Sequence, residues 1–476
     1  MRANKRSKGK VGIIVFVLIV LAIIAGFFLY FIVNRDVSPE SVEEPPAIQP
    51  GISDELEFDM PEYDLFEEEF QGNEEDTEPE ITPEPEPTPE PEADVEIAIP
   101  PEDTIISVAT ADPELFNELN LIAANFNATA VSMILYDGNT ATYFTYEFGY
   151  ADVRARRPVD VDTVFRVASL AKLTTVICTM VLVDQGLIDL DEDISVYLGY
   201  DVINPYFPES TITVRMLMQH TSSIYESTAF RTATGGRSSD TMRSLLERGT
   251  SFLKEEPGTY FEYSNFGYAI LGAINELVSG KTMDSLAREV LFEPLGIDAA
   301  YVSRNLYDTN RIAQIYNNNH DVRRSVQSML ATGESGVLGR DMHLAQGNLF
   351  ISAIDYARIL AMLGNGGQFR DVKVLSSEAV SEIHEANFEV LEYGYMQGLA
   401  VRYSYGDILP GIGFYWHTGS AFGVFAQYLY IADASTNRGI VVVTTGATTD
   451  REGNGMISVC TQLSRAMWER LSVLFD

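Results

Sequence analysis

An abrupt change in composition limits the folded part of this chain to residues 104–476. Between Asp36 and Asp103 there are 26 acidic residues and no lysine or arginine. Residues 81–94, ITPEPEPTPEPEAD, alternate proline with glutamate. Such a segment cannot bury enough apolar surface to offset the entropy lost on ordering, and its prolines and like charges keep it extended. We therefore predict a disordered linker over residues 34–103 and one folded domain after it.

Residues 11–33, VGIIVFVLIVLAIIAGFFLYFIV, contain no charged side chain. As a helix, at about 1.5 Å per residue, they are long enough to cross a hydrocarbon core of about 30 Å. Five basic residues precede them: Arg2, Lys5, Arg6, Lys8 and Lys10. Because such charges stay inside, we predict a cytoplasmic tail (1–10), a transmembrane helix (11–33) and an extracytoplasmic remainder. The alternative is a cleaved signal peptide, but this apolar run is longer than the usual ~7–15 residues and lacks a small-residue cleavage site.

The charge and cysteine content of residues 104–476 exclude several classes of function. This region has 43 acidic and 26 basic side chains, a formal charge of −17, whereas nucleic-acid binding needs clustered positive charge. Cys178 and Cys460 form no Cys-x-x-Cys pair, and we expect both to be thiols in the core. The sequence does not decide whether they form a disulfide. We expect no nucleic-acid partner, metal or cofactor, and the oligomeric state is open. Three histidines without metal-ligand spacing are expected at the surface: His320, His343 and His384.

The order of predicted elements indicates one α/β layer with a helical insert. Asp112, Pro113 and Glu114 are typical of a helix start, and the helix should reach about residue 124. Strands over 130–136 and 141–148 flank Asp137-Gly138-Asn139, a hairpin signal. We also expect a helix over 169–184, followed by a helical and loop-rich stretch over 203–350. Residues typical of strands return near residue 416 and predict strands over 425–431 and 439–444. A final helix is expected over 456–474. Both ends of the domain should therefore share one layer.

A serine and a lysine three residues apart, Ser169 and Lys172, begin the helix predicted from residue 169. Apolar residues continue at helical spacing, so the helix should be buried: Leu170, Leu173, Val176, Ile177, Met180 and Val181. Free amides and the dipole at a helix N-terminus favour negative charge on a hydroxyl there. Because positions i and i+3 share a face, Lys172 can reach Ser169. Desolvation lowers the pKa of a buried lysine, which turns it into a proton acceptor.

The same Ser-x-x-Lys spacing occurs twice more, so this motif alone does not identify an active site. Ser7 and Lys10 lie on the predicted cytoplasmic tail, with no core around them. Ser251 and Lys254 are followed at once by EEPG, a loop sequence with no buried helix to hold the lysine. We therefore favour Ser169.

Two further segments offer a proton relay and an oxyanion site. In PGTYFEYSNFGYAILG, Tyr263 is a candidate proton acceptor, because the Lys172 cation could lower the phenol pKa from its usual ~10. Asn265 could orient Lys172 or the substrate. In GFYWHTGSAFG, the small residues after His417 would let a substrate lie along a strand edge. Two backbone N–H groups could then point at one carbonyl oxygen: those of Ser169 and Ser420.

Three motifs in order resemble those of penicillin-recognising serine hydrolases: Ser169-x-x-Lys172, Tyr263-x-Asn265 and His417-Thr418-Gly419. The likeness is greatest to class C β-lactamases, DD-peptidases and related esterases. It extends over roughly residues 105–470, including VLVDQGLIDLDEDISVYL, ITVRMLMQHTSSI, PGTYFEYSNFGYAILGAINELVSGKTM and VLFEPLGI. The resemblance implies an α+β fold, in which an antiparallel sheet flanked by the N- and C-terminal helices meets a mostly helical lobe at a catalytic cleft.

The resemblance also implies a role for each motif residue. Ser169 would be acylated by a carbonyl substrate, and Lys172 and Tyr263 would move its proton. Which of the two is the base stays open, because their titrations would be coupled. Five residues would bind the substrate, with the Ser169 and Ser420 amides as the oxyanion hole: Asn265, His417, Thr418, Gly419 and Ser420.

Two residues depart from the family pattern. His417 stands where a lysine is usual, and with an unperturbed pKa of about 6.5 it would be mostly neutral at pH 7, which argues against an efficient β-lactamase. If it bound a carboxylate as imidazolium, acylation would improve as the pH falls. Ser223 replaces the glycine that usually ends the loop beginning at His220, so a different loop shape is expected, since serine tolerates a positive φ poorly. We expect His220 itself to be structural.

The sequence thus predicts a membrane-anchored serine hydrolase of a bacterial cell envelope that acts outside the membrane through an acyl-enzyme. Its substrate would be a peptidoglycan stem peptide ending in D-Ala-D-Ala, an ester or a β-lactam. The alternative of another class is a non-catalytic sensor or scaffold that binds cell-wall material or penicillin. A D-amino-acid amidase or transacylase with the same residues is a third possibility.

Overall fold

The computed structural model describes residues 103–406, 408–409 and 411–475. The predicted cytoplasmic tail, membrane span and linker lie outside these residues, apart from Asp103 at the end of the linker. Within the described part of the chain, no helix is both long and apolar enough to cross a membrane. The described residues cover almost all of the range 104–476 over which the sequence predicts one folded domain.

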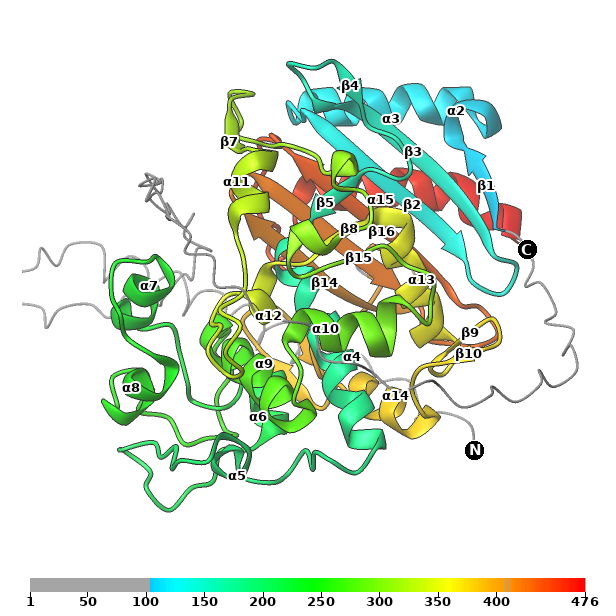
Figure 1. The fold of residues 1–476 in the computed structure, drawn as a ribbon. Helices are drawn as coiled ribbons and strands as arrows, with labels where there is room; N and C mark the ends of the chain where they lie inside the picture. The colour runs from blue at the N-terminus through cyan, green and yellow to red at the C-terminus, as the bar shows by residue number, and fades with distance from the viewer. Residues whose placement is uncertain (1–102, 407, 410, 476) are drawn as a thin grey trace, which may run out of the picture. The chain divides into compact units, whose positions relative to one another are not determined.

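One large sheet organises the described residues (Figure 1). Its spatial order is β1-β3-β2-β16-β15-β14-β13-β12-β11, with β4 beside β3. Neighbours are antiparallel except β1 and β3, which are parallel. The strands are β1 (Thr104–Ser107), β2 (Ala130–Asp137), β3 (Thr142–Asp152), β4 (Arg157–Pro158), β11 (Phe388–Val390), β12 (Tyr395–Gln397), β13 (Arg402–Tyr405), β14 (Gly413–Ala421), β15 (Val424–Tyr430) and β16 (Arg438–Thr445). Because β2 pairs with β16, the two ends of the domain share one layer, as predicted.

Both faces of the sheet are covered by helices: α3 (Pro113–Asn125) and α15 (Ser458–Leu471) on one face, and α13 (Ala353–Gly364) on the other. Because both faces are covered, the side chains of strand β16 are buried on both sides. Ile440 and Val442 belong to the core under α3 and α15, whereas Val441 and Val443 belong to the core on the α13 side. A strand buried on both faces is a continuous apolar run rather than an alternating one.

Between β3 and β11 the chain forms a mostly helical lobe on the α13 side of the sheet. Helices α4 and α9 pack against each other near its centre, and α12 contacts both. The lobe helices are α4 (Ala171–Asp184), α5 (Ile194–Leu198), α6 (Val214–Met218), α7 (Thr228–Thr234), α8 (Met242–Glu247), α9 (Asn265–Ser279), α10 (Met283–Ala287), α11 (Val326–Ala331), α12 (Leu344–Gly347) and α14 (Ser377–His384). Three small antiparallel pairs complete it: β5 (Val164–Arg166) with β8 (Phe350–Ser352), β6 (Ile315–Tyr316) with β7 (Val322–Arg324), and β9 (Gln368–Phe369) with β10 (Val372–Lys373).

Most predicted elements are confirmed, and the α+β class with them. Asp112 accepts a hydrogen bond from the Leu115 N–H at 2.9 Å and so starts α3. Asp137 Oδ1 accepts from the N–H groups of Asn139 (3.0 Å) and Thr140 (2.9 Å), which turns the predicted hairpin. The predicted return of strand signal near residue 416 was too late, because β11, β12 and β13 precede it. Two of these have only three residues each and lie at the far edge of the sheet, too short to give a clear pattern.

Cys178 and Cys460 are free, buried thiols that lie in the cores on opposite faces of the sheet. Burial raises the pKa of both thiols. His320 is exposed as predicted, but His343 and His384 are half-buried, so the prediction of a surface position was wrong for these two. Within the described residues, no group of three or more histidine, cysteine or acidic side chains is arranged to hold a metal ion.

Candidate active site

Ser169 lies in a short 3-10 turn, Ala168–Leu170, between β5 and α4. The α-helix itself begins at Ala171, two residues later than predicted. Ala168 has a φ of +48°, a left-handed conformation that is strained for a residue other than glycine. The main chain beside it is fixed by a hydrogen bond of 2.9 Å from the Val167 N–H to the Leu349 carbonyl. Sharp turns of this kind are common where a functional side chain must be aimed.

Lys172 is fully buried in the first turn of α4, and its ammonium faces Ser169. Its Nζ lies 3.2 Å from Ser169 Oγ, 2.6 Å from Asn265 Oδ1 and 2.6 Å from the main-chain oxygen of Gln346. These hydrogen bonds offset part of the cost of taking the ammonium out of water. The predicted contacts of Lys172 with Ser169 and Asn265 are both present.

Tyr263 comes from the segment just before α9 and lies on the same lysine. Lys172 Nζ is 4.9 Å from the centroid of the Tyr263 ring and 5.4 Å from that of Tyr268. The ammonium therefore faces two aromatic surfaces, an arrangement that stabilises a cation electrostatically. Ser169, Lys172, Tyr263 and Asn265 thus form one group of side chains.

His220 packs against Tyr263 and bonds to the main chain next to it, in line with its predicted structural role. Its ring centroid is 4.4 Å from that of Tyr263, and its Nδ1 accepts a hydrogen bond from the Ser264 N–H at 3.1 Å. Burial, together with the charges of Lys172 and Arg402, holds the pKa of His220 well below its usual range. The imidazole is therefore neutral and serves as an acceptor that fixes the segment carrying Tyr263.

Ser223, in the loop that begins at His220, has a φ of +64°, so the loop takes the left-handed conformation in spite of the serine. This is the conformation that serine was expected to tolerate poorly. The Ser223 hydroxyl donates to the main-chain oxygen of Glu255 at 2.7 Å and accepts from Asn204 Nδ2 at 2.8 Å. These bonds hold the residue in a conformation that serine alone disfavours.

Strand β14 carries the third motif and passes directly against the Ser169 turn. A Cβ placed on Gly419 would lie 2.5 Å from the Val167 carbonyl oxygen and 3.2 Å from the Ser169 nitrogen. Only glycine permits this approach. His417, Thr418 and Ser420 lie on the same strand, so the main chains of Ser169 and of the third motif adjoin, as the expected oxyanion arrangement requires.

His417 is 2% exposed, and its surroundings disfavour a positive charge. Its Nδ1 lies 2.7 Å from the Thr418 carbonyl oxygen and must carry a proton to bond there, while its Nε2 is buried without a partner in the described part of the chain. Burial above all, then the charges of Arg402 and Lys172, hold the pKa of His417 well below its usual range. The prediction of a neutral His417 agrees with this environment.

Arg402, on β13 opposite Trp416, is a site residue that sequence reasoning missed. Its side chain is 8% exposed, and its guanidinium carbon lies 5.0 Å from the ring centroid of Tyr395, 5.1 Å from Trp416 and 5.9 Å from Tyr263. Its Nε is buried without a hydrogen-bond acceptor among the residues that the structure describes. The sequence RYSY does not indicate that Arg402 is buried, since an arginine on a short strand is usually exposed.

Glu226 was also missed. Its Oε1 accepts a hydrogen bond of 3.0 Å from the Asn265 N–H, and the carboxyl group is half-buried beside Lys172. It follows the His220 loop in the sequence, but a glutamate near the start of one short helix gives no sign that it will contact a different helix. Its carboxyl group therefore belongs to the surroundings of Lys172.

The structure also separates Ser169 from its rival. Ser251 is buried, with its Oγ 2.7 Å from Ser227 Oγ, whereas Lys254 is exposed and lies 5.4 Å from the Tyr206 ring centroid. These two side chains therefore serve different contacts. Ser7 and Lys10 lie outside the described residues.

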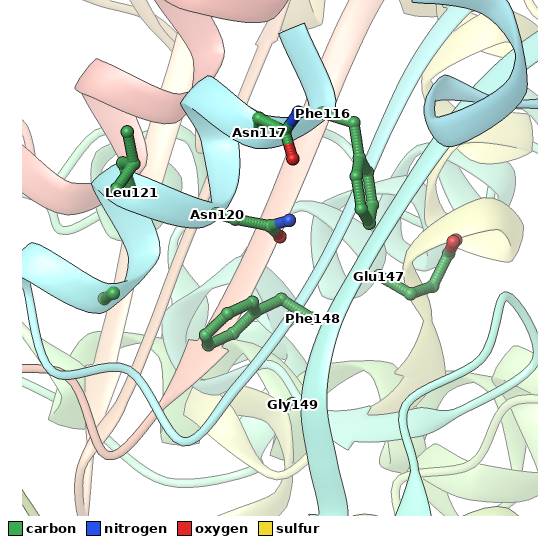
Figure 2. Close-up of a pocket in the computed structure, with 8 residues that line it drawn as sticks. Phe116, Asn117, Asn120, Leu121, Glu147, Phe148 and Gly149 are labelled. Carbon is green, nitrogen blue, oxygen red and sulfur yellow. The ribbon is translucent and has the colours of Figure 1, made fainter. Parts of the chain in front are cut away.

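A hollow of about 640 Å³ lies elsewhere, between α3 and β3 (Figure 2). It is lined by Phe116, Asn117, Asn120, Leu121, Ala124, Glu147, Phe148 and Gly149. The Glu147 side chain points away from the Phe148 ring, as expected for neighbours on a strand (Figure 2). None of the motif residues lines this hollow, so it is separate from the candidate active site.

Comparison with known proteins agrees with these motifs. The family model described as "Beta-lactamase" matches residues 120–458. "Penicillin-binding protein 4" of Amycolatopsis lactamdurans is 27% identical over 297 residues, which cover 58% of this chain and 71% of that protein. "D-alanyl-D-alanine-carboxypeptidase/endopeptidase AmpH" of Escherichia coli K12 is 29% identical over 184 residues, covering 37% of this chain and 46% of the relative. Against "Penicillin-binding protein 4*" of Bacillus subtilis, the matched part spans only 40% of the relative's length.

Solved structures share the fold. "Beta-Lactamase/D-Alanine Carboxypeptidase from Pseudomonas syringae" superposes with a TM-score of 0.58 at 18% identity, covering 76% of this chain and 99% of that one. The D-amino acid amidase of Ochrobactrum anthropi gives a TM-score of 0.56 at 20% identity, covering 76% and 100%. At these identities the likeness concerns the fold alone. The family match over residues 120–458, however, shows that this chain belongs to the beta-lactamase family of serine hydrolases.

Proposed function

We propose that this protein is a membrane-anchored, extracytoplasmic serine hydrolase that forms an acyl-enzyme at Ser169. We further propose that its substrate carries a free carboxylate next to the scissile bond, as a peptidoglycan stem peptide ending in D-Ala-D-Ala does. The observation that carries the second statement is the buried guanidinium of Arg402, whose charge acts on His417 and whose Nε has no acceptor among the described residues.

A buried cation is costly unless it is paired, so an arginine held among aromatic rings without a carboxylate suits an anionic ligand. The guanidinium also compensates for the neutral His417, which stands where a lysine is usual in the family. A charge-assisted hydrogen bond to a substrate carboxylate contributes roughly 1.5–3 kcal/mol, enough to select acids over amides or esters of the same shape. Thr418, whose Oγ1 lies 3.4 Å from Arg451 Nη1, adds a hydroxyl on the adjoining strand.

The site residues account for each step of the reaction. Ser169 Oγ attacks the carbonyl carbon while its proton passes to the Lys172–Tyr263 pair, and the main-chain N–H groups of Ser169 and Ser420 receive the oxyanion. Collapse of the tetrahedral adduct breaks the C–N bond, and the relay returns the proton to the departing D-Ala amine. Water then attacks the ester carbonyl and loses a proton to the relay. The C–O bond to Ser169 breaks, and the relay passes that proton to Ser169 Oγ, which frees the hydroxyl and the shortened peptide acid. Which member of the pair is the base stays open, because the two groups are coupled.

The anchoring part of the proposal rests on sequence. The uncharged run of residues 11–33, preceded by five basic residues, supports a single span with the N-terminus in the cytoplasm. The acidic, proline-rich residues 34–103 would then hold the enzyme away from a bacterial cell membrane, towards its cell-wall substrate. Fusion of a reporter enzyme after residue 103, with and without residues 11–33, tests this topology.

The substrate test compares two peptides that differ only in their C-terminus: an acyl-L-Lys-D-Ala-D-Ala acid and its C-terminal amide. Release of D-Ala from the acid, lost in Ser169→Ala, is expected. Arg402→Gln should raise KM for the acid roughly tenfold to a hundredfold, in line with ~1.5–3 kcal/mol, and leave the amide nearly unchanged. Arg154→Gln, at an exposed arginine on the β3–β4 turn, is the matched control. Equal effects of Arg402→Gln on acid and amide would contradict the carboxylate proposal.

Assays of the same protein with simple esters, D-amino-acid amides and a penicillin separate the alternatives. Cleavage of simple esters with no preference for an acid favours the esterase function, and cleavage of D-amino-acid amides favours the amidase. Acylation of Ser169 by penicillin without turnover of any peptide or ester favours the sensor or scaffold.

A further inference from the structure

We propose that Glu226 is a positioning residue. Its carboxylate holds the main-chain N–H of Asn265 at the start of α9, so that the Asn265 amide oxygen faces Lys172, and its negative charge acts on the ammonium. This role rests on the proposed serine hydrolase function, which it deepens.

The Asn265 side chain has two unlike ends, and its orientation matters. Its Oδ1 accepts from Lys172 Nζ at 2.6 Å, while its Nδ2 can only donate. If the amide were reversed, its NH₂ group would face the ammonium, donor against donor. Asn265 must therefore be held in this orientation, and the contact that the structure gives for it is a main-chain one, to the carboxylate of Glu226.

Glu226 is itself anchored by the main chain of the residue it orients. Its Oε1 accepts from the Asn265 N–H at 3.0 Å. Asn265 is the first residue of α9, and a carboxylate is favoured at the N-terminus of a helix of this length. The N-cap of α9 is already supplied by Ser264, whose hydroxyl accepts from the Gly267 N–H at 2.9 Å. Glu226 is therefore not needed as the cap.

The charge of Glu226 acts on Lys172 as well. The acceptors of Nζ include a hydroxyl, a side-chain amide oxygen and a main-chain carbonyl, none of which is charged. Burial raises the pKa of Glu226, and the hydrogen bond from the Asn265 N–H and the Lys172 charge oppose this rise. Because the interaction of two charges is mutual, an ionised Glu226 stabilises the ammonium to the same extent.

Other titratable groups face this pair and do not replace Glu226. Lys172 is faced by the rings of Tyr263 and Tyr268, and its charge lowers the pKa of both His220 and His417, which are neutral. Glu226 is faced by Arg231 of α7 and by Glu262, which precedes α9. Glu226 is the carboxylate that bonds to Asn265, the residue that in turn touches Nζ.

The proposal gives Glu226→Gln a signature that a purely structural contact would not give. The glutamine keeps the size and an oxygen for the Asn265 N–H but removes the charge. The ammonium then loses its proton more easily, so the pH profile of acylation moves to lower pH, by about one unit for a charge lost at this range. This direction holds whether Lys172 is the base or the cation that assists Tyr263. Glu226→Asp, which restores the charge, should move the profile back.

The test measures the rate of acylation by a chromogenic ester and a penicillin from pH 5.5 to 10 in the full-length chain. Asp112→Asn is the matched control, since Asp112 is also a carboxylate that accepts a main-chain N–H at a helix start, but in α3. We expect a shift for Glu226→Gln, partial reversal for Glu226→Asp and none for Asp112→Asn. A lower rate with an unmoved profile in Glu226→Gln would overturn the proposal and leave Glu226 as a structural contact.

A second readout does not depend on activity. The ¹³Cε resonance of Lys172, assigned by its loss in Lys172→Met, should titrate at lower pH in Glu226→Gln than in the wild type. If no probe acylates the wild-type protein, the proposed function fails, and this titration still decides the role of Glu226. Identical titrations in the two proteins would overturn it.

Discussion

The ammonium nitrogen of Lys172 lies 3.2 Å from the hydroxyl oxygen of Ser169, although the lysine side chain is fully buried and no other buried residue of its helix is charged. A buried lysine at this distance has a chemical reason to be there, because a desolvated amine can take or stabilise the proton of the hydroxyl. The neighbouring Asn265 and Tyr263 and the adjoining strand β14 complete the same group.

Replacement of Lys172 by methionine should lower the acylation rate by roughly 10²–10⁴, the usual contribution of a positioned proton-transfer group. The fold should persist, because methionine fills a similar volume, although Asn265 Oδ1 and the Gln346 carbonyl lose a donor. Stopped-flow acylation with a chromogenic ester, together with thermal unfolding, separates the two effects. Lys254→Met removes the exposed lysine of the rival motif and should leave the rate unchanged; a comparable loss there would count against Ser169–Lys172 as the reacting pair.

Gly419→Ala should disable the site without adding any polar group. Its Cβ would lie 2.5 Å from the Val167 carbonyl and 3.2 Å from the Ser169 nitrogen, so β14 must move away from the Ser169 turn. A displacement near 1 Å commonly costs about 10²-fold in rate. Gly453→Ala is the control, since nothing lies within 4 Å of its added Cβ. Steady-state kcat values for the two variants give the answer, and equal values would contradict the close approach.

Substitutions at Ser223 should reveal its strained conformation. Alanine and glycine both remove the hydroxyl and its hydrogen bonds, but only glycine tolerates a φ of +64° without strain. Ser223→Gly should therefore be more stable than Ser223→Ala by about 1–2 kcal/mol, the cost of a left-handed residue with a Cβ. Urea unfolding of both variants measures this difference. A more stable alanine variant would show that the loop does not hold this φ.

His384 should make stability depend on acid pH. Its ring packs against Tyr415 and Tyr430, with Nε2 2.7 Å from the Tyr430 hydroxyl, and burial lowers its pKa to about 4. In the unfolded chain a histidine titrates near ~6.5, so between these values only the unfolded state takes up the proton. The free energy of unfolding is therefore undiminished above about pH 6.5 and falls by at most about 1.4 kcal/mol per unit down to about pH 4.

The variant His384→Gln separates the contribution of His384 to the pH dependence of stability from that of the carboxylates, which also titrate in acid. Its unfolding free energy, measured with denaturant between pH 7 and 4, should fall less steeply than that of the wild type. Parallel curves would show that His384 takes up its proton in the folded state as well.

Much of this site could be predicted from the sequence because its contacts are local or lie in motifs. The pairing of Ser169 with Lys172 follows from helix geometry, and the need for a small residue at Gly419 follows from a strand edge. The fold class could be predicted for a similar reason. Helix starts such as Asp112 and turns such as Asp137-Gly138-Asn139 depend on contacts within a few residues of the sequence.

The residues that were missed act over long distances in the sequence. Arg402 becomes a buried cation only because β13 lies beside β14 and Tyr263 packs across it. Glu226 meets Asn265 across 39 positions, through the start of a different helix. Ser223 shows the opposite case: propensity disfavoured its conformation, and tertiary hydrogen bonds to Glu255 and Asn204 outweighed that preference.

Ser169 is the residue whose acylation the whole mechanism requires. Intact-protein mass spectrometry after incubation with a penicillin or a fluorophosphonate, followed by peptide mapping, tests this most directly. The mechanism predicts one adduct per chain, located on Ser169 and absent from Ser169→Ala, with Ser251→Ala labelled like the wild type. An adduct on another residue, or labelling that persists in Ser169→Ala, would contradict it.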